Sequence, residues 1–225
     1  TLIPFLPNPF PQNTNMKILS TTFIVFILSV STLFGQVYND ATLARVIQQD
    51  RSSKDSSGNL RTLSVTDHMY RADVYMSNRQ FPQARAHWTK VINTYPTHAR
   101  IPNALFGMGR SNMWERKYDL AVTWFDKLAK DHSNTLMGRE GLAYKASSYV
   151  RLGDSLNAAK TYEQYTVMFP YGKRIESSHL NIIDAYRELG EYNKANLWVA
   201  KTTSRFSGMK TATNALHGRL RMEVF

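Results

Sequence analysis

The stretch FPQARAHWTKVINTYP, residues 81–96, decides the fold. Its apolar residues follow one another at steps of three, four, three, one and three positions, which places them on one face of an α-helix. These residues are Phe81, Ala84, Trp88, Val91, Ile92 and Tyr95. Pro96 disfavours helical backbone in the residue before it. The stretch therefore predicts an amphipathic helix over residues 81–94.

The same pattern returns later in the chain with a period of 37 residues. Ala84 is followed at this interval by Ala121, Ala158 and Ala195. An apolar column, four residues after the alanines, contains Trp88, Phe125, Tyr162 and Val199. A second column, nine residues before the alanines, contains Tyr75, Asn112, Tyr149 and Tyr186. Four units in step over such a length indicate a solenoid.

Each unit reads as two helices joined by a short turn. The first helices are expected at residues 67–77, 101–114, 138–151 and 175–188, and the second at 81–94, 118–131, 155–168 and 192–205. Gly153 and Gly190 lie in two of the turns, where the end of a helix needs a left-handed residue. The alanines are expected where the two helices of a unit approach closely. One unit cannot bury its apolar face alone, so stacking stabilises the array.

This order of small residue, aromatic residue, turn, aromatic residue, alanine, aromatic residue and final proline resembles the tetratricopeptide repeat family. The resemblance implies an all-α fold, a right-handed superhelix of antiparallel helix pairs, with four repeats over residues 67–208. The usual tetratricopeptide period is about 34 residues. The sequence therefore predicts three extra residues per unit, between the units.

In tetratricopeptide arrays the first helices line a concave groove, and the resemblance implies the same for this chain. The groove-binding candidates are Asp73, Arg110, Trp114, Arg151, Asp184 and Arg187. Met113 and Trp114, beside Arg110, could hold a peptide or the face of a sugar. Because apolar stripes usually pack, Met76, Met113 and Val150 are expected in the core instead.

Composition and charge bear on the partner. The chain of 225 residues has 28 Lys and Arg against 17 Asp and Glu, a net charge of +11, and no cysteine, which excludes disulfides and thiolate metal sites. The basic residues are scattered, which indicates a solvated surface or long-range attraction to an anionic polymer or membrane surface. We expect a partner protein or peptidoglycan as the ligand, and no nucleic acid.

The N-terminus predicts export. Residues 16–36, MKILSTTFIVFILSVSTLFGQ, show the basic start, apolar centre and small residue near the cut that are typical of a secretory signal peptide. The chain is therefore expected in the periplasm or secreted, without a stable membrane span after cleavage; an uncut segment would make it an anchored adaptor. Residues 1–15 are expected to be an upstream, non-native segment or a disordered tail.

The flanks of the repeats carry two further expectations. Residues 37–66 should form a capping helix, with Asp40 as its N-cap, and a polar loop. Residues 209–225 match the first helix of a fifth repeat. From this match, the sequence predicts that the natural protein continues past Phe225.

Few residues suggest catalysis. The histidines are never spaced from a carboxylate as metal ligands would be, and they are expected at the surface as His68, His87, His98, His132, His179 and His217. The pair Glu176-Ser177 has the order of the catalytic Glu and its Ser in lytic transglycosylases, but the dipole of a helix explains a carboxylate in a first turn. No catalytic residue, metal or cofactor is expected in this chain.

A second resemblance bears on function. The segments RADVYMSNRQFPQARAHW (71–88), ALFGMGRS (104–111) and GKRIESSHLNIIDAYRELGEYNKA (172–195) resemble the helical N-terminal region of soluble lytic murein transglycosylases. The resemblance implies a non-catalytic periplasmic module that positions a peptidoglycan-cleaving domain beyond Phe225. The alternative is a stand-alone tetratricopeptide scaffold of the cell envelope that binds a partner protein and has no enzymatic activity.

Overall fold

The computed structural model describes residues 40–223, and these residues form ten helices. They are α2 (Asp40–Ser52), α3 (Val65–Ser77), α4 (Phe81–Thr94), α5 (Ile101–Trp114), α6 (Tyr118–Asp131), α7 (Leu136–Leu152), α8 (Ser155–Met168), α9 (Ile175–Glu188), α10 (Tyr192–Arg205) and α11 (Lys210–Glu223). Within these residues the only β-structure is an isolated bridge between Lys54 and Leu60. The predicted all-α solenoid is confirmed.

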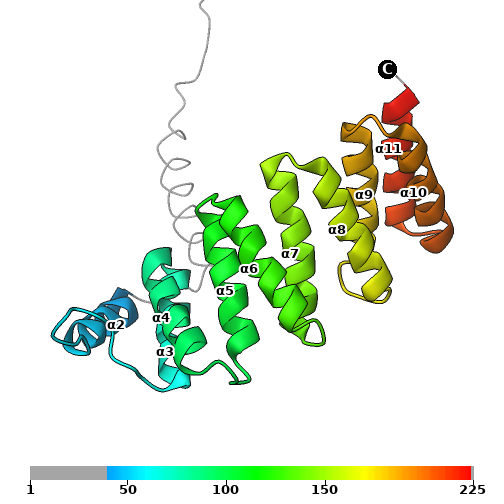
Figure 1. Cartoon of the computed structure of the whole chain (residues 1–225). Helices are drawn as coiled ribbons and strands as arrows, with labels where there is room; N and C mark the ends of the chain where they lie inside the picture. The colour runs from blue at the N-terminus through cyan, green and yellow to red at the C-terminus, as the bar shows by residue number, and fades with distance from the viewer. Residues whose placement is uncertain (1–39, 224–225) are drawn as a thin grey trace, which may run out of the picture.

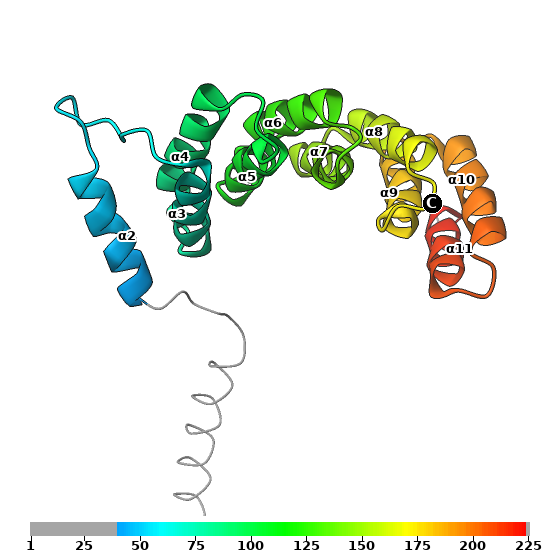
Figure 2. The same cartoon turned by 90° about the horizontal axis from the view of Figure 1, so that it is seen from below.

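The helices pair and stack in chain order (Figure 1). In the view from below they follow an arch, with α4, α6, α8 and α10 along the outer side and α3, α5, α7 and α9 along the inner side (Figure 2). The connections between pairs, such as residues 95–100 and 169–174, are longer than the turns within pairs, such as residues 78–80 and 115–117. The inner position of α3, α5, α7 and α9 means that the first helix of each pair faces the hollow of the arch (Figure 2).

The turns within the pairs share one backbone conformation. Their central residues, again 37 positions apart, all have positive φ: Arg79 (59°), Arg116 (60°), Gly153 (75°) and Gly190 (71°). The next backbone N–H in each turn closes the helix end, as Gln80 N does on the carbonyl of Tyr75 and Asp154 N on that of Tyr149. These are the bonds by which a left-handed residue satisfies the last carbonyls of a helix.

The alanine column lies inside the fold. Ala84, Ala121, Ala158 and Ala195 are all completely buried. Close approach also occurs between units, because a Cβ on Gly107 of α5 would lie 2.5 Å from the indole ring of Trp88 on α4. The small residues therefore set the distance at which helices stack, and the large side chains of the next column fill the space between them.

The buried apolar residues form three separate clusters. The first extends from Val46 to Leu128 and the second from Ala146 to Ala215. A small third cluster between them consists of Leu142, Ala143 and Tyr165. The helix α7 contributes to the second and third clusters, and its Tyr144 packs against the first. It is the helix on which the two halves of the array meet.

The prediction that the histidines lie at the surface was wrong for three of them, because His68, His87 and His179 are buried. His87 Nε2 on α4 lies 2.9 Å from Asp50 Oδ2 on α2. Tyr75 on α3 donates its hydroxyl to the same oxygen at 2.6 Å, and Arg71 pairs with the other oxygen. The side chain of Asp50 thus joins α2 to the first repeat. Burial opposes its ionisation, but the hydrogen bonds from His87, Tyr75 and Arg71 prevail and lower the pKa of Asp50 to about 2.

Several predictions from the sequence fall outside the described residues. The proposed signal peptide at residues 16–36, the upstream residues 1–15 and residues 37–39 of the expected capping segment belong to this group. Within residues 40–223, no helix combines the length and apolar character that crossing a bilayer requires.

Candidate functional site

The structure brings three of the six predicted groove residues into one pocket. Arg110, Trp114 and Arg151 line a cavity of about 560 Å3 at the turn ends of the first three helix pairs. The remaining lining residues are Arg79, Met113, Arg116, Tyr118 and Tyr144. We call this cavity the arginine pocket. It gathers four guanidinium groups and no carboxylate.

The four arginines of the pocket come from three different positions in the repeat. Arg79 and Arg116 occupy the left-handed positions of the first two turns. Arg110 lies one helical turn before the end of α5, and Arg151 lies in the last turn of α7. The regular stacking of the pairs therefore places equivalent turns side by side and collects side chains from three units.

Among the described residues, the four guanidinium groups have no anionic partner, although the Arg110 guanidinium lies 5.8 Å from the ring centroid of Phe106. Within the described part of the chain, none of them forms an ion pair or a side-chain hydrogen bond. Glu115, which directly precedes Arg116 in the sequence, is already paired with Arg85 at 2.8 Å and with Lys117 at 2.9 Å. Burial raises the pKa of Glu115, but the hydrogen bonds and charges of these two cations lower it more, so the pKa is below its usual value. The positive charge of the pocket is therefore not compensated from within.

Aromatic rings form part of the wall. The guanidinium carbon of Arg79 lies 5.6 Å from the ring centroid of Trp114, and 55% of Trp114 is exposed. On the other side, the Arg174 guanidinium lies 4.7 Å from the ring of Tyr144 and pairs with Glu140 at 2.7 Å. Cation–π contacts of this kind orient a ring without covering its edge. The pocket therefore combines the aromatic rings of Trp114 and Tyr144 with arginines that have no carboxylate partner in the part of the chain that the structure describes.

The other three groove candidates lie elsewhere. Asp184 and Arg187 form an ion pair at 3.1 Å on α9, and Asp184 lines a separate cavity of about 280 Å3 beside α11. Asp73 on α3 lies at the surface, where partial desolvation by the surrounding protein raises the pKa of its carboxyl group, and the charge of Arg100 only partly offsets this shift. These residues do not join the arginine pocket.

The three residues expected in the core differ in their burial. Met76 is half-buried and packs against the first cluster, as predicted. Val150 is exposed, so its assignment to the core was wrong. Met113 packs against the first cluster and also lines the pocket.

Sequence reasoning missed Arg79 and Arg116 as site residues. The signal was present, because both residues fall in the column of Gly153 and Gly190, the positions at which a left-handed turn was expected. The pair Glu176-Ser177 has a structural place instead. Glu176 accepts a hydrogen bond from Thr211 of α11, and Ser177 donates to the Arg174 carbonyl at 3.0 Å.

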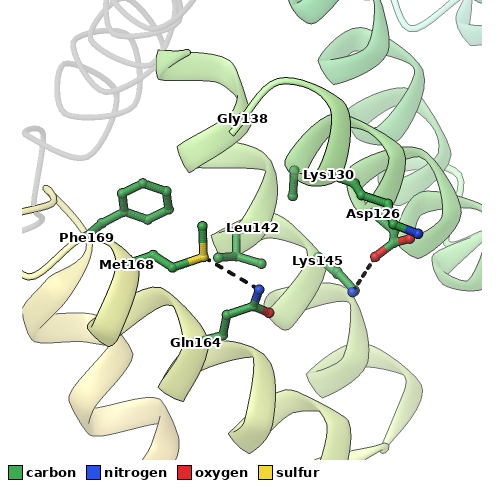
Figure 3. A pocket seen from close by; sticks show the side chains of 9 residues that line it. Asp126, Lys130, Gly138, Leu142, Lys145, Gln164, Met168 and Phe169 are labelled. Carbon is green, nitrogen blue, oxygen red and sulfur yellow. Dashed lines mark hydrogen bonds and ion pairs between the residues drawn. The ribbon is translucent and has the colours of Figure 1, made fainter. Parts of the chain in front are cut away.

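A second cavity, of about 220 Å3, opens between α6, α7 and α8 (Figure 3). Lys145 in its wall is paired with Asp126 at 2.6 Å, and Gln164 donates to the sulfur of Met168 at 3.6 Å. Its volume is less than half that of the arginine pocket, and one of its two lysines is neutralised. It is the weaker candidate for a ligand site.

A third cavity, of about 580 Å3, lies between α2, the 53–60 loop and α4, with Asp50 and His87 in its wall. Their polar atoms are already paired with Tyr75, Arg71, His68 and each other. No group of three or more His, Asp or Glu side chains able to hold a metal ion occurs among the described residues.

The comparisons with known proteins agree on the fold. No protein-family model and no curated protein matches the chain. Among solved structures, the chain is similar to a putative kinesin light chain of Podosopora anserina with nearly identical TPR-like repeats, at 15% identity and a TM-score of 0.54 over 82% of this chain and 92% of that chain. It is also similar to MamA.

For MamA from AMB-1 the identity is 15% and the TM-score 0.54, over 77% of this chain and 92% of that chain. A further MamA structure gives 15% identity and a TM-score of 0.51, over 72% of this chain and 82% of that chain. With the helix pairs and turns described above, these likenesses define the fold as a TPR-like α-solenoid.

Proposed function

We propose that the chain is an exported helical-repeat module of the cell envelope that binds a partner protein on the inner side of its arch. The arginine pocket carries this proposal, because it presents four unpaired cations around an exposed Trp114. Tryptophan and arginine are the residues that most often dominate protein interfaces. The apolar segment at residues 16–36 supports export.

Site-specific photo-crosslinking in the cells that make the protein tests this function. A photoreactive residue at Met113 lies in the pocket, and one at the exposed Thr123 lies on the outer helix α6. We expect one discrete protein adduct from position 113 and none from position 123. Adducts from neither position, or equally from both, would contradict binding on the inner side.

The location is tested separately. Osmotic-shock fractionation and sequencing of the mature N-terminus should find the protein outside the cytoplasm and cut near residue 36. An intact N-terminus in the membrane fraction would support the anchored adaptor instead.

A second candidate is the non-catalytic N-terminal part of a peptidoglycan lytic transglycosylase. It is supported by the resemblance of residues 71–88, 104–111 and 172–195 to that enzyme family. In this version, the module positions peptidoglycan or the catalytic domain. The full-length gene product should then release muropeptides from purified peptidoglycan. A full-length product that neither binds nor cleaves peptidoglycan would contradict this second candidate and favour the partner-binding scaffold.

A further inference from the structure

The turns of the array contain an unexplained choice of residue. All four central residues have φ between 59° and 75°, a conformation that glycine adopts freely and that costs other residues backbone energy. The third and fourth turns use Gly153 and Gly190, but the first and second use Arg79 and Arg116. The same chain therefore keeps a costly residue at two of four equivalent positions.

Interactions within the chain do not explain this choice. Both Arg79 and Arg116 are exposed, and neither forms an ion pair or side-chain hydrogen bond within the described residues. Arg79 has one exposed cation–π contact, with Trp114. What the two arginines share is a place in the wall of the arginine pocket. Unfavourable backbone conformations cluster at binding sites and active sites.

We propose that Arg79 and Arg116 bind the ligand directly, and that this role explains why arginine occupies a position with an unfavourable backbone conformation. We propose further that the arginine pocket binds an extended acidic segment of the partner. This inference rests on the proposed function and adds the chemistry of the partner. The pocket supplies four guanidinium groups, each able to hold a carboxylate by two parallel hydrogen bonds. Met113, Trp114 and Tyr118 offer apolar surface between the charges.

The shape of the site favours a protein segment over other anions. The cations surround a cavity of about 560 Å3, into which single side chains fit, whereas an anionic bilayer presents a flat surface. The Arg79 guanidinium covers part of the Trp114 ring on which a sugar would stack. Arg79, Arg110 and Arg151 belong to three successive units, so one extended segment can contact all of them.

Binding of a synthetic probe tests the inference. The probe is a ten-residue peptide with Glu and Asp on both sides of one Phe, and its control carries Gln and Asn instead. Fluorescence anisotropy at about 150 mM salt limits long-range attraction to the net positive chain. We expect the wild-type protein to bind the acidic peptide and the control peptide at least tenfold more weakly.

The variants Arg79→Gly and Arg116→Gly separate binding from stability. Each should weaken binding of the acidic peptide at least tenfold, while the melting temperature stays unchanged or rises by up to about 3 °C because the strain is relieved. Arg139→Gln removes the same charge from an exposed site on α7 outside the pocket, and it should retain wild-type affinity. Arg110→Gln tests a pocket arginine without backbone strain and should also weaken binding.

Three results would overturn the inference. One is equal binding by wild type and the Arg79→Gly/Arg116→Gly double variant, and another is an equal loss with Arg139→Gln. The third is tighter binding of phosphatidylglycerol vesicles or an anionic glycan than of the acidic peptide. The photo-crosslink at Met113 distinguishes the two proposals. If the adduct persists in the double variant, the proposal that the inner side binds a partner stands, and only the proposal that the bound segment is acidic fails.

Discussion

His68 Nδ1 lies 2.9 Å from His87 Nδ1, inside the first repeat. The partners of both rings assign the protons. The backbone N–H of Leu63 donates to His68 Nε2 at 3.0 Å, so the His68 proton is on Nδ1 and points at His87. His87 therefore accepts at Nδ1 and donates from Nε2 to Asp50 at 2.9 Å. The chain of hydrogen bonds is complete only while both rings are neutral and the carboxylate is ionised.

The first prediction concerns pH. Burial lowers the pKa of His68 to about 4, assisted by His87, and burial with nearby Arg205 and Lys201 lowers that of His179 to about 4. Between pH 6.5 and 4 the unfolded chain takes up protons that the folded chain does not, so the free energy of unfolding falls as pH falls through this window. The total loss should be on the order of a few kcal/mol. Urea unfolding at pH 7, 5.5 and 4.5 measures it.

The variant His179→Leu isolates one histidine. Leucine occupies the equivalent buried positions Leu105 and Leu142, so the variant should fold at pH 7 with less dependence of stability on pH. His98→Gln, at an exposed site, should keep the wild-type profile. Identical profiles for wild type and His179→Leu would contradict the role of this buried ring.

A second prediction concerns Asp50→Asn. The substitution removes the charge that Arg71, Tyr75 and His87 share, and breaking a buried ion pair costs about 3–5 kcal/mol. Since Asp50 joins α2 to the first repeat, we expect α2 to detach before the rest unfolds. Limited proteolysis should then cut within residues 53–61 sooner than in the wild type. Asp131→Asn, on an exposed helix end, is the control, and an equal cleavage rate in both would rule out this attachment.

A third prediction concerns the contact between the first and second units. In Gly107→Ala the new methyl group would overlap the Trp88 ring, and such overpacking costs about 1–3 kcal/mol. Chemical denaturation gives the change in the free energy of unfolding. Thr89→Ala, at an exposed position on α4, should change stability little. If Gly107→Ala instead stabilises the protein through its better helix propensity, the close contact described here is wrong.

A fourth prediction concerns Gly153→Ala. A Cβ at this position would meet no atom within 4 Å, so any cost arises from the backbone at φ 75°. We expect a loss of about 1 kcal/mol in the free energy of unfolding. Thermal unfolding of this variant beside Asn134→Ala, an exposed loop position, provides the measurement. A variant as stable as the wild type would show that the left-handed turn is not strained for side chains.

A fifth prediction concerns Ala121→Leu. Ala121 is fully buried between α5 and α6, so the larger side chain should push the two helices apart at a cost of about 1–3 kcal/mol. Ala200→Leu, exposed on α10, is the matched control. An unchanged melting temperature for Ala121→Leu would contradict the alanine column.

The repeat made most of the fold predictable from the sequence. Helix ranges such as 81–94 and 101–114 agree with α4 and α5, because the period aligns four independent copies of each boundary. The burial of Ala121 followed from the same alignment. A helix pair has few ways to stack on its copies, so the pattern of small and large residues was sufficient.

The site was less predictable, since it depends on individual exceptions to the repeat. His68 and His179 share a column with Leu105 and Leu142, and that column predicts their burial; judging them by residue type alone led to the wrong surface assignment. Arg110, Trp114 and Arg151 were found because they lie on the first helices. The period places Arg79 and Arg116 in equivalent neighbouring turns, but the gathering of their side chains with Arg110 and Arg151 depends on side-chain geometry, which the repeat does not encode. The ion pair of Asp184 with Arg187 depends on side-chain geometry in the same way.

The division of the core has a mechanical meaning for the arginine pocket. Arg79 and Arg116 directly follow helices of the first cluster, whereas Arg151 lies in the last turn of α7, which also contributes to the second cluster. A change in how α7 packs against the first cluster would therefore alter the distances between Arg151 and the other two arginines. A bound segment that contacts Arg151 together with Arg79 and Arg116 would resist that change, so binding in the pocket should make the array more rigid at α7.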